Sequence, residues 1–79
     1  MTIKILGAGC ANCEKLESLA KQAAAELGIQ ATFEKVKEID KILEYGIART
    51  PGLVIDEVVK SSGRIPTVEQ IKTFIQESM

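Results

Sequence analysis

The chain has 79 residues, and 46% of them are hydrophobic, so one domain spanning residues 1–79 can bury its own core without a structural metal. Lys and Arg number 10 and Asp and Glu 11, which leaves a net charge of −1. This balance, with one tyrosine, two phenylalanines and no tryptophan, argues against nucleic acid or anionic membrane as a partner and against base-stacking platforms.

The N-terminal apolar run is too short to be a signal peptide. It ends at Leu6, where Gly7-Ala8-Gly9 interrupts it. No other stretch approaches the roughly 20 apolar residues that a membrane-spanning helix needs. We therefore expect a cytoplasmic protein without a membrane partner, and we expect a monomer.

A strand and a long helix are the first predicted elements. Ile3–Leu6 is short, apolar and β-branched, which is typical of a buried strand, and the glycines at positions 7 and 9 end it. Gly28 supplies the stop signal of the helix. Its apolar stripe has helical spacing and comprises Leu16, Leu19, Ala20, Ala23, Ala24 and Leu27.

The middle of the chain predicts a second strand and a short helix. Ala31–Val36 has strand composition, with Phe33 as its strongest apolar anchor. Glu38–Tyr45 predicts a helix that ends at Gly46. The inner face of this helix is expected to consist of Ile39, Ile42 and Leu43.

A hairpin and a third helix complete the chain. Leu53–Ile55 and Val58–Lys60 predict paired strands across Asp56-Glu57, a turn that lacks the favoured glycine, and Ser61-Ser62-Gly63 closes the hairpin. Thr67 and Gln70 form a capping-box pattern ahead of an apolar face. That face comprises Val68, Ile71, Phe74 and Ile75.

The predicted order β-α-β-α-β-β-α defines an α/β fold. A helical crossover of the usual right hand makes the first two strands parallel, and a tight turn makes the last two antiparallel. The sequence therefore predicts a mixed four-stranded sheet with helices on both faces.

Cys10 and Cys13 are the only cysteines, and they stand where the first strand passes into the first helix. A disulfide closing so short a loop constrains the unfolded chain little, so this spacing indicates chemistry rather than stabilisation. The amide groups of the first helical turn lower the pKa of a thiol placed there, which makes Cys10 the expected nucleophile. Cys13, one turn further on and less exposed, is the expected resolving thiol.

Two other interpretations of the cysteine pair fit the sequence less well. Two cysteines can be inert apolar residues, and a structural zinc site takes four Cys or His ligands where this chain has two cysteines and no histidine. Thr50-Pro51-Gly52 is the second motif of interest. Taken without the family resemblance, it predicts a trans Thr50–Pro51 peptide bond, because only about 5–6% of X–Pro bonds are cis.

The element order, Gly9-Cys10-Ala11-Asn12-Cys13 after the first strand and Thr50-Pro51 before the third, resembles the thioredoxin superfamily. The resemblance is strongest to its small, glutaredoxin-sized redox-active disulfide proteins of archaea and bacteria, and it covers nearly the whole chain. It implies a thioredoxin-like fold and a thiol–disulfide oxidoreductase or electron carrier. The redox-active disulfide of Cys10 and Cys13 would then replace any dissociable cofactor.

The same resemblance implies roles for residues outside the cysteine motif. Pro51 would be cis and would pack beside the disulfide, Thr50 would offer backbone hydrogen bonds to an extended substrate segment, and Gly63 would end the last strand near the site. The expected partners are proteins that contain disulfides and an unidentified reductase. Where glutaredoxins carry Gly-Gly and an acidic segment, this chain has Gly63-Arg64-Ile65.

A soft-metal module is the alternative function. Residues 2–13 also resemble the start of heavy-metal-associated domains, whose two thiolates suit Cu(I). However, Ala8 stands where those domains have methionine, and those domains end in a strand whereas this sequence predicts a final helix. The element order favours redox chemistry.

Overall fold

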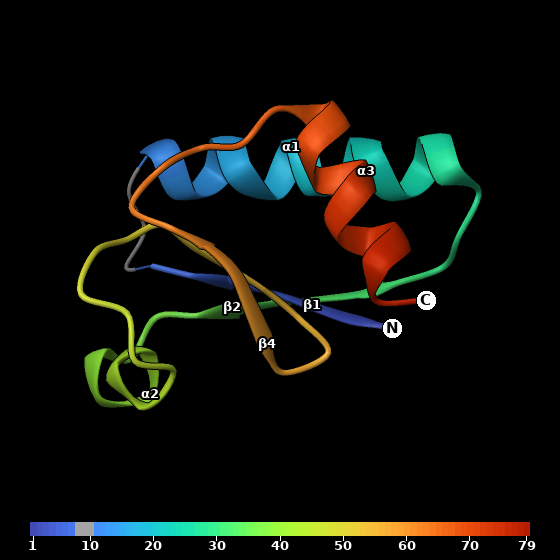
Figure 1. Ribbon diagram of the computed structural model, residues 1–79. Helices are drawn as coiled ribbons and strands as arrows, with labels where there is room; N and C mark the ends of the chain where they lie inside the picture. The colour runs from blue at the N-terminus through green and yellow to red at the C-terminus, as the bar shows by residue number, and fades with distance from the viewer. Residues whose placement is uncertain (8–10) are drawn as a thin grey trace.

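The elements follow one another in the predicted order β-α-β-α-β-β-α (Figure 1). The structure is a computed structural model and describes residues 1–7 and 11–79. The elements are β1 (Thr2–Leu6), α1 (Ala11–Leu27), β2 (Thr32–Val36), α2 (Ile39–Glu44), β3 (Gly52–Ile55), β4 (Val58–Ser62) and α3 (Val68–Glu77).

The four strands form one mixed sheet in the order β2-β1-β3-β4. β1 pairs with β2 in parallel, as the crossover through α1 requires, and with β3 antiparallel. β3 and β4 form the antiparallel hairpin. The sequence-based fold class is therefore confirmed, and β1 and β3 occupy the centre of the sheet.

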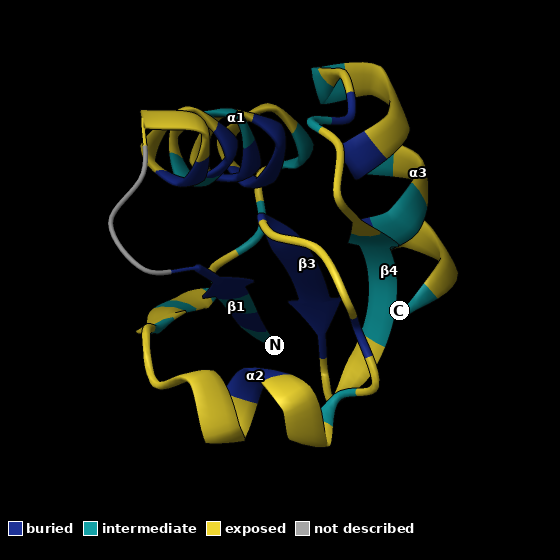
Figure 2. Ribbon diagram, turned by 90° about the vertical axis from the view of Figure 1, so that its left-hand side faces the viewer, coloured by how far each residue is buried: buried dark blue, intermediate teal, exposed yellow. Residues whose placement is uncertain are grey.

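The helices divide between the two faces of the sheet, with α1 and α3 on one face and α2 on the other (Figure 2). The larger core lies under α1 and α3, and a smaller core lies under α2. Every residue of β3 is buried, because its two faces contribute to both cores. The larger core includes Ile3, Ile5, Leu16, Leu53, Ile55, Ile71 and Ile75, and the smaller one consists of Leu6, Ile42, Ile47 and Val54.

The predicted inner face of α2 is wrong at two of its three positions. Ile39 is 70% exposed and Leu43 60% exposed, and only Ile42 is buried. The helix has six residues, so fewer than two turns lie against the sheet. Ile47, from the loop that follows α2, fills the remaining part of the smaller core.

The hairpin also differs from the prediction, because β4 does not end at Lys60 but continues to Ser62. The register passes from Val54 opposite Val59 to Leu53 opposite Ser61, so Lys60 is the additional residue of a bulge. A bulge cannot be read from composition, which is why Ser61 and Ser62 resembled the end of the hairpin.

The hairpin turn places two non-glycine residues in the left-handed region. The φ angles are 48° at Asp56 and 69° at Glu57, as a two-residue hairpin turn demands. Polar contacts compensate for this conformation. The carboxylate of Asp56 accepts a hydrogen bond from the backbone N–H of Thr2 at 2.8 Å, and the carboxylate of Glu57 lies 2.6 Å from Lys4 Nζ.

Lys4 links the turn to the α2 face of the sheet. Its Nζ donates to the hydroxyl of Tyr45 at 3.0 Å and lies 3.9 Å from the carboxylate of Glu34. The ring of Tyr45 packs against the smaller core. The hydrogen bond to Lys4 lowers the pKa of Glu57, and the hydrogen bonds to Glu57 and Tyr45 raise the pKa of Lys4.

Glu57→Gln should make the protein less stable at neutral pH, and the difference from the wild type should shrink in acid. The folded-state pKa of Glu57 is lowered, so the stabilisation is present above the ordinary carboxyl value of about 4.3 and is lost as the pH falls through the folded-state pKa. Urea unfolding of both proteins between pH 7 and pH 2 measures the difference.

Glu44→Gln is the matched control, because Glu44 is exposed at the end of α2 and forms no salt bridge within residues 1–7 and 11–79. Its effect should be small at every pH. A Glu57→Gln effect that stays constant down to pH 2 would contradict a role for the ion pair with Lys4.

The N-terminus of α3 is capped as the sequence predicts. Gln70 N–H donates to Thr67 Oγ1 at 3.1 Å, and Thr67 N–H donates to Gln70 Oε1 at 3.0 Å. This reciprocal capping box fixes where the chain turns from the segment after β4 into α3.

Candidate functional site

Cys13 lies in the first turn of α1 and is 6% exposed. It shares the buried stripe of the helix with Leu16 and Ala20, because residues three and seven positions further on occupy the same helical face. The structure therefore gives Cys13 the low exposure that the sequence predicts. Cys13 is disulfide-bonded, and Cys10, the only other cysteine of the sequence, lies outside the described residues.

Gly7 provides the space that the sulfur of Cys13 occupies. It follows the last residue of β1, and its backbone N–H donates to the carbonyl oxygen of Val36 at 2.9 Å. A Cβ at this position would overlap Cys13 Sγ and would lie 3.8 Å from Thr50 Cβ. Gly7 does not have a positive φ, so this position requires glycine for the space beside the sulfur and not for a left-handed turn.

The loop before β3 brings Thr50 and Pro51 to the same place. The Thr50–Pro51 peptide bond is cis, the form that the family resemblance implies. Pro51 is buried, whereas Thr50 is exposed. Because Thr50 lies beside Gly7, and Gly7 lies against Cys13 Sγ, this loop and the first turn of α1 form one site.

Gly63 is hydrogen-bonded to the loop that carries Thr50 and Pro51. Its backbone N–H donates to the carbonyl oxygen of Pro51 at 2.9 Å. Its φ of +72° lies in the left-handed region, and a Cβ would come within 2.9 Å of Arg49 Cβ. The structure therefore brings Cys13, Thr50, Pro51 and Gly63 together, and Cys10 falls outside the described residues.

A small cavity adjoins Cys13 on the side of β2. Its volume is about 40 Å³, which is enough for one water molecule. Lys35 and Lys37 line it together with Glu14, Gly7 and Ile5. Lys35 also forms a salt bridge with Glu17 at 3.2 Å. Neither lysine was predictable from the sequence as a neighbour of Cys13, because only the parallel pairing of β2 with β1 brings them to this cavity.

Comparison with known proteins identifies the family of this chain. The family model described as “Thioredoxin domain” matches residues 1–76. A protein named thioredoxin from Methanothermobacter thermautotrophicus is 51% identical over 75 residues, which cover 95% of this chain and 97% of that protein. The chain belongs to the thioredoxin family. A second thioredoxin, from Methanocaldococcus jannaschii, is 40% identical over 72 residues and is matched over 83% of its length.

Membership of the thioredoxin family confirms the resemblance seen in the motifs. The thioredoxin family consists of thiol–disulfide oxidoreductases, so the chemistry of the family is that of dithiols and disulfides in proteins. In the part of the chain that the structure describes, no helix is long and apolar enough to cross a membrane.

Proposed function

We propose that this protein exchanges dithiol for disulfide with protein substrates, with Cys10 as the attacking thiol and Cys13 as the resolving thiol. One observation carries the proposal. The buried sulfur of Cys13 lies against Gly7, and Thr50, which precedes the cis Pro51, lies against the same glycine. In a member of the thioredoxin family, this juxtaposition supports a redox site with a substrate-docking loop beside it.

The proposed reaction has two exchange steps. The thiolate of Cys10 attacks one sulfur of the substrate disulfide, an S–S bond forms between protein and substrate, and the other substrate sulfur leaves as a thiolate that takes up a proton. The thiolate of Cys13 then attacks the sulfur of Cys10, and the second substrate thiolate leaves. Two electrons have passed to the substrate, and a reductase returns them to the Cys10–Cys13 disulfide. No dissociable cofactor takes part.

The surroundings of the two thiols support Cys10 as the attacking thiol and Cys13 as the resolving thiol. Cys10 directly precedes α1 in the sequence, and the first amide groups of a helix stabilise a nearby thiolate. Cys13 is buried, so an intramolecular attack on Cys10 suits it better than an encounter with a large substrate. The cavity beside Cys13 is lined by Lys35 and Lys37 together with Glu14, so charged side chains lie close to the buried thiol.

Substrate docking is assigned to the backbone beside Cys13. Thr50 is exposed and can offer its backbone groups to an extended segment, as in β-strand addition. The hydrogen bond from Gly63 to Pro51 fixes the loop that carries Thr50. A side chain at Gly63 would press against Arg49, the residue that precedes Thr50, so the glycine keeps this loop in place.

The Cu(I)-carrier alternative is less well supported. The described elements follow the order β-α-β-α-β-β-α, whereas heavy-metal-associated domains have the order β-α-β-β-α-β. The thioredoxin family is also defined by redox chemistry and not by metal transfer.

A turnover assay separates the two functions. With dithiothreitol as reductant, the protein should catalyse the reduction of insulin disulfides, and the double variant Cys10→Ser/Cys13→Ser should leave only the uncatalysed rate. Cu(I) affinity is measured on the reduced protein against a dithiol peptide of the same motif. Absence of turnover combined with Cu(I) binding far tighter than that of the peptide would overturn the redox proposal.

A further inference from the structure

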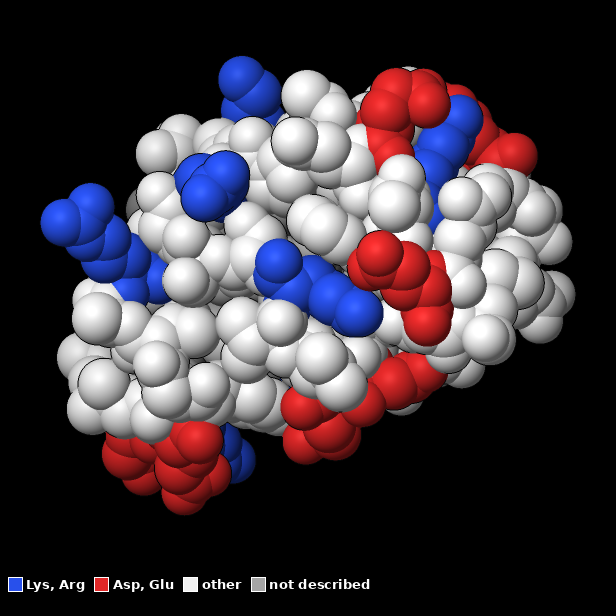
Figure 3. All heavy atoms as spheres, in the orientation of Figure 1, with Lys and Arg blue, Asp and Glu red and all other residues white. Residues whose placement is uncertain are grey.

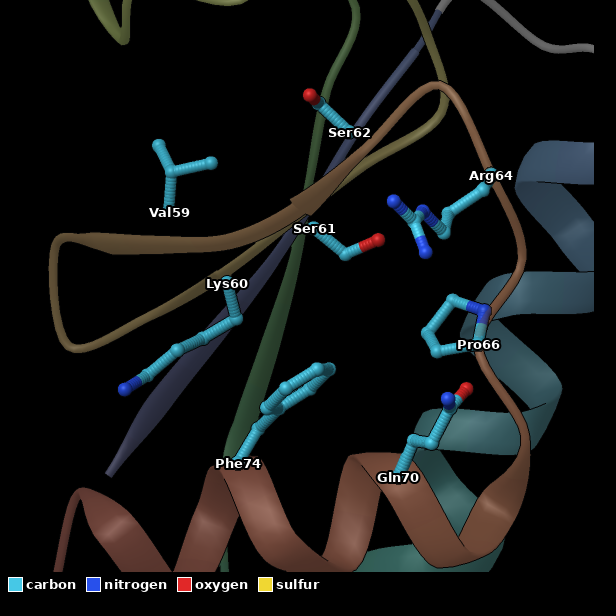
Figure 4. Close-up of a pocket in the computed structure, with 8 residues that line it drawn as sticks. All are labelled: Val59, Lys60, Ser61, Ser62, Arg64, Pro66, Gln70 and Phe74. Atoms are coloured by element: carbon cyan, nitrogen blue, oxygen red, sulfur yellow. The ribbon is translucent and has the colours of Figure 1, made fainter.

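A second pocket lies between β4 and α3, next to the site described above (Figure 4). Its volume is about 370 Å³, within the range of small-ligand and side-chain subsites. Ser61 and Arg64 line it from β4 and the loop that follows, and Pro66, Gln70 and Phe74 line it from the loop and from α3. The bulge at Lys60 creates this arrangement, because it sets Ser61 opposite the core residue Leu53 and so turns it toward α3.

The pocket contains hydrogen-bonding capacity that the described residues do not use. Ser61 Oγ is buried and has no hydrogen-bond partner there, although buried polar atoms are nearly always paired. Arg64 forms no salt bridge with any described residue. In Figure 4 the guanidinium of Arg64 and the hydroxyl of Ser61 point toward one another across the upper part of the pocket.

A carboxylate fits these two groups. A guanidinium only donates hydrogen bonds and a hydroxyl can donate one, so both can converge on the oxygens of one anion. Below them, the ring of Phe74 and Pro66 give the pocket an apolar wall that suits a methylene stem. A Glu or Asp side chain combines these two features.

The charge of the surrounding face agrees with an acidic ligand. In Figure 3, basic side chains occupy the left and centre of this face, where the segment after β4 and β4 itself lie in Figure 1. Acidic side chains lie along its lower margin, at its upper right beside a basic group, and directly to the right of the central basic group. Lys60, another lining residue, forms a salt bridge with Glu77 at 3.8 Å, which leaves Arg64 as the unneutralised cation at the pocket among the described residues.

The position of the pocket points to a polypeptide. Arg64 directly follows Gly63, whose N–H holds Pro51, so the pocket continues from the loop that docks substrate. β4 is an edge strand, and its outer backbone is not paired with another strand of the sheet. An extended segment that docks at Thr50 therefore has the open edge of β4 beside it and the pocket within its reach.

We infer that this pocket is a specificity subsite, which accepts an acidic side chain near the reacting cysteine of the substrate protein. The inference rests on the proposed function and names a class of substrate for it: proteins with Asp or Glu close to the disulfide. Ser61 and Arg64 bind the carboxylate, and Phe74 contacts its stem.

The test uses two disulfide peptides that differ only in Glu or Gln near the cysteine, assayed at low ionic strength. The wild type should reduce the Glu peptide with a kcat/KM about tenfold higher, the size expected for a charge-assisted hydrogen bond. Arg64→Gln should abolish this preference, and Ser61→Ala should reduce it. Lys41→Gln, an exposed position on α2 on the opposite face of the sheet, should keep it.

Two further measurements distinguish failure of the proposed function from failure of the proposed subsite. Reduction of the neutral substrate hydroxyethyl disulfide should be the same in all four proteins, and its absence in the wild type would overturn the proposed function only. NMR titration with unreactive serine analogues of the peptides tests the pocket alone. Equal binding of the Glu and Gln analogues, or binding of succinate as tight as that of the Glu analogue, would overturn the subsite.

Discussion

Cys13→Ser should stop the reaction at a mixed disulfide between Cys10 and the substrate. The first exchange needs only the attacking thiol, but release of product needs a second thiol held close to the first. A well-oriented intramolecular group acts at an effective concentration far above that of any added thiol, so multiple turnover should fall by at least about a hundredfold. Mass spectrometry of the protein after one cycle with a disulfide peptide should find the covalent adduct.

Cys10→Ser is the matched control for this experiment. It leaves the thiol that is 6% exposed and packed in the first turn of α1, so no adduct should accumulate. In the reduced wild type, iodoacetamide should therefore modify Cys10 first. Faster modification of Cys13, or an adduct that forms in Cys10→Ser and not in Cys13→Ser, would show that the two roles are reversed.

Local patterns predicted those parts of the fold that local physics determines. Leu16 and Ala20 lie on the buried face of α1 because the helical repeat places them there, and their position follows from spacing alone. Thr67 and Gln70 form a capping box because the two side chains satisfy backbone groups within their own turn. The order of strands and helices then restricts the sheet to a mixed one.

Features that depend on contacts between distant segments were not predictable in this way. The helical spacing of Ile39 and Leu43 suggested a buried face, but only tertiary packing shows that Ile47 occupies that space. Lys35 and Lys37 reach Cys13 through the parallel pairing of β2 with β1.

The candidate site likewise contains features that the sequence predicted and features that depend on tertiary contacts. The cysteine motif and Thr50-Pro51 are visible in the sequence, and the family resemblance implied that they lie together. The bulge at Lys60, which turns Ser61 toward α3, has no compositional signal, so the pocket beside Arg64 was not anticipated. The sequence indicated only that Gly7 ends the first strand, because its need for space depends on how the first turn of α1 places the sulfur of Cys13.

Gly7→Ala should destabilise the protein by about 1–3 kcal/mol, the usual cost of forcing an extra methyl group into a packed core. The new Cβ would overlap Cys13 Sγ and come within 3.4 Å of Cys13 Cβ, and this side chain is buried in the first turn of α1 and has little freedom to move away. Relief would require displacement of β1, of α1 or of the loop at Thr50. Urea unfolding measures the loss, and insulin reduction should slow as well because the site itself is displaced.

A double-mutant cycle on the reduced proteins identifies the cause. If the clash with the sulfur is responsible, Cys13→Ala should relieve it, so the combined effect of Gly7→Ala and Cys13→Ala should be smaller than the sum of the single effects. Gly46→Ala is the control, because its φ of +77° makes a side chain unfavourable while no atom lies within 4 Å of the new Cβ. That variant should lose about 1 kcal/mol and keep wild-type turnover. Additive effects of Gly7→Ala and Cys13→Ala would show that Gly7 serves the backbone of β1 rather than the space around the sulfur.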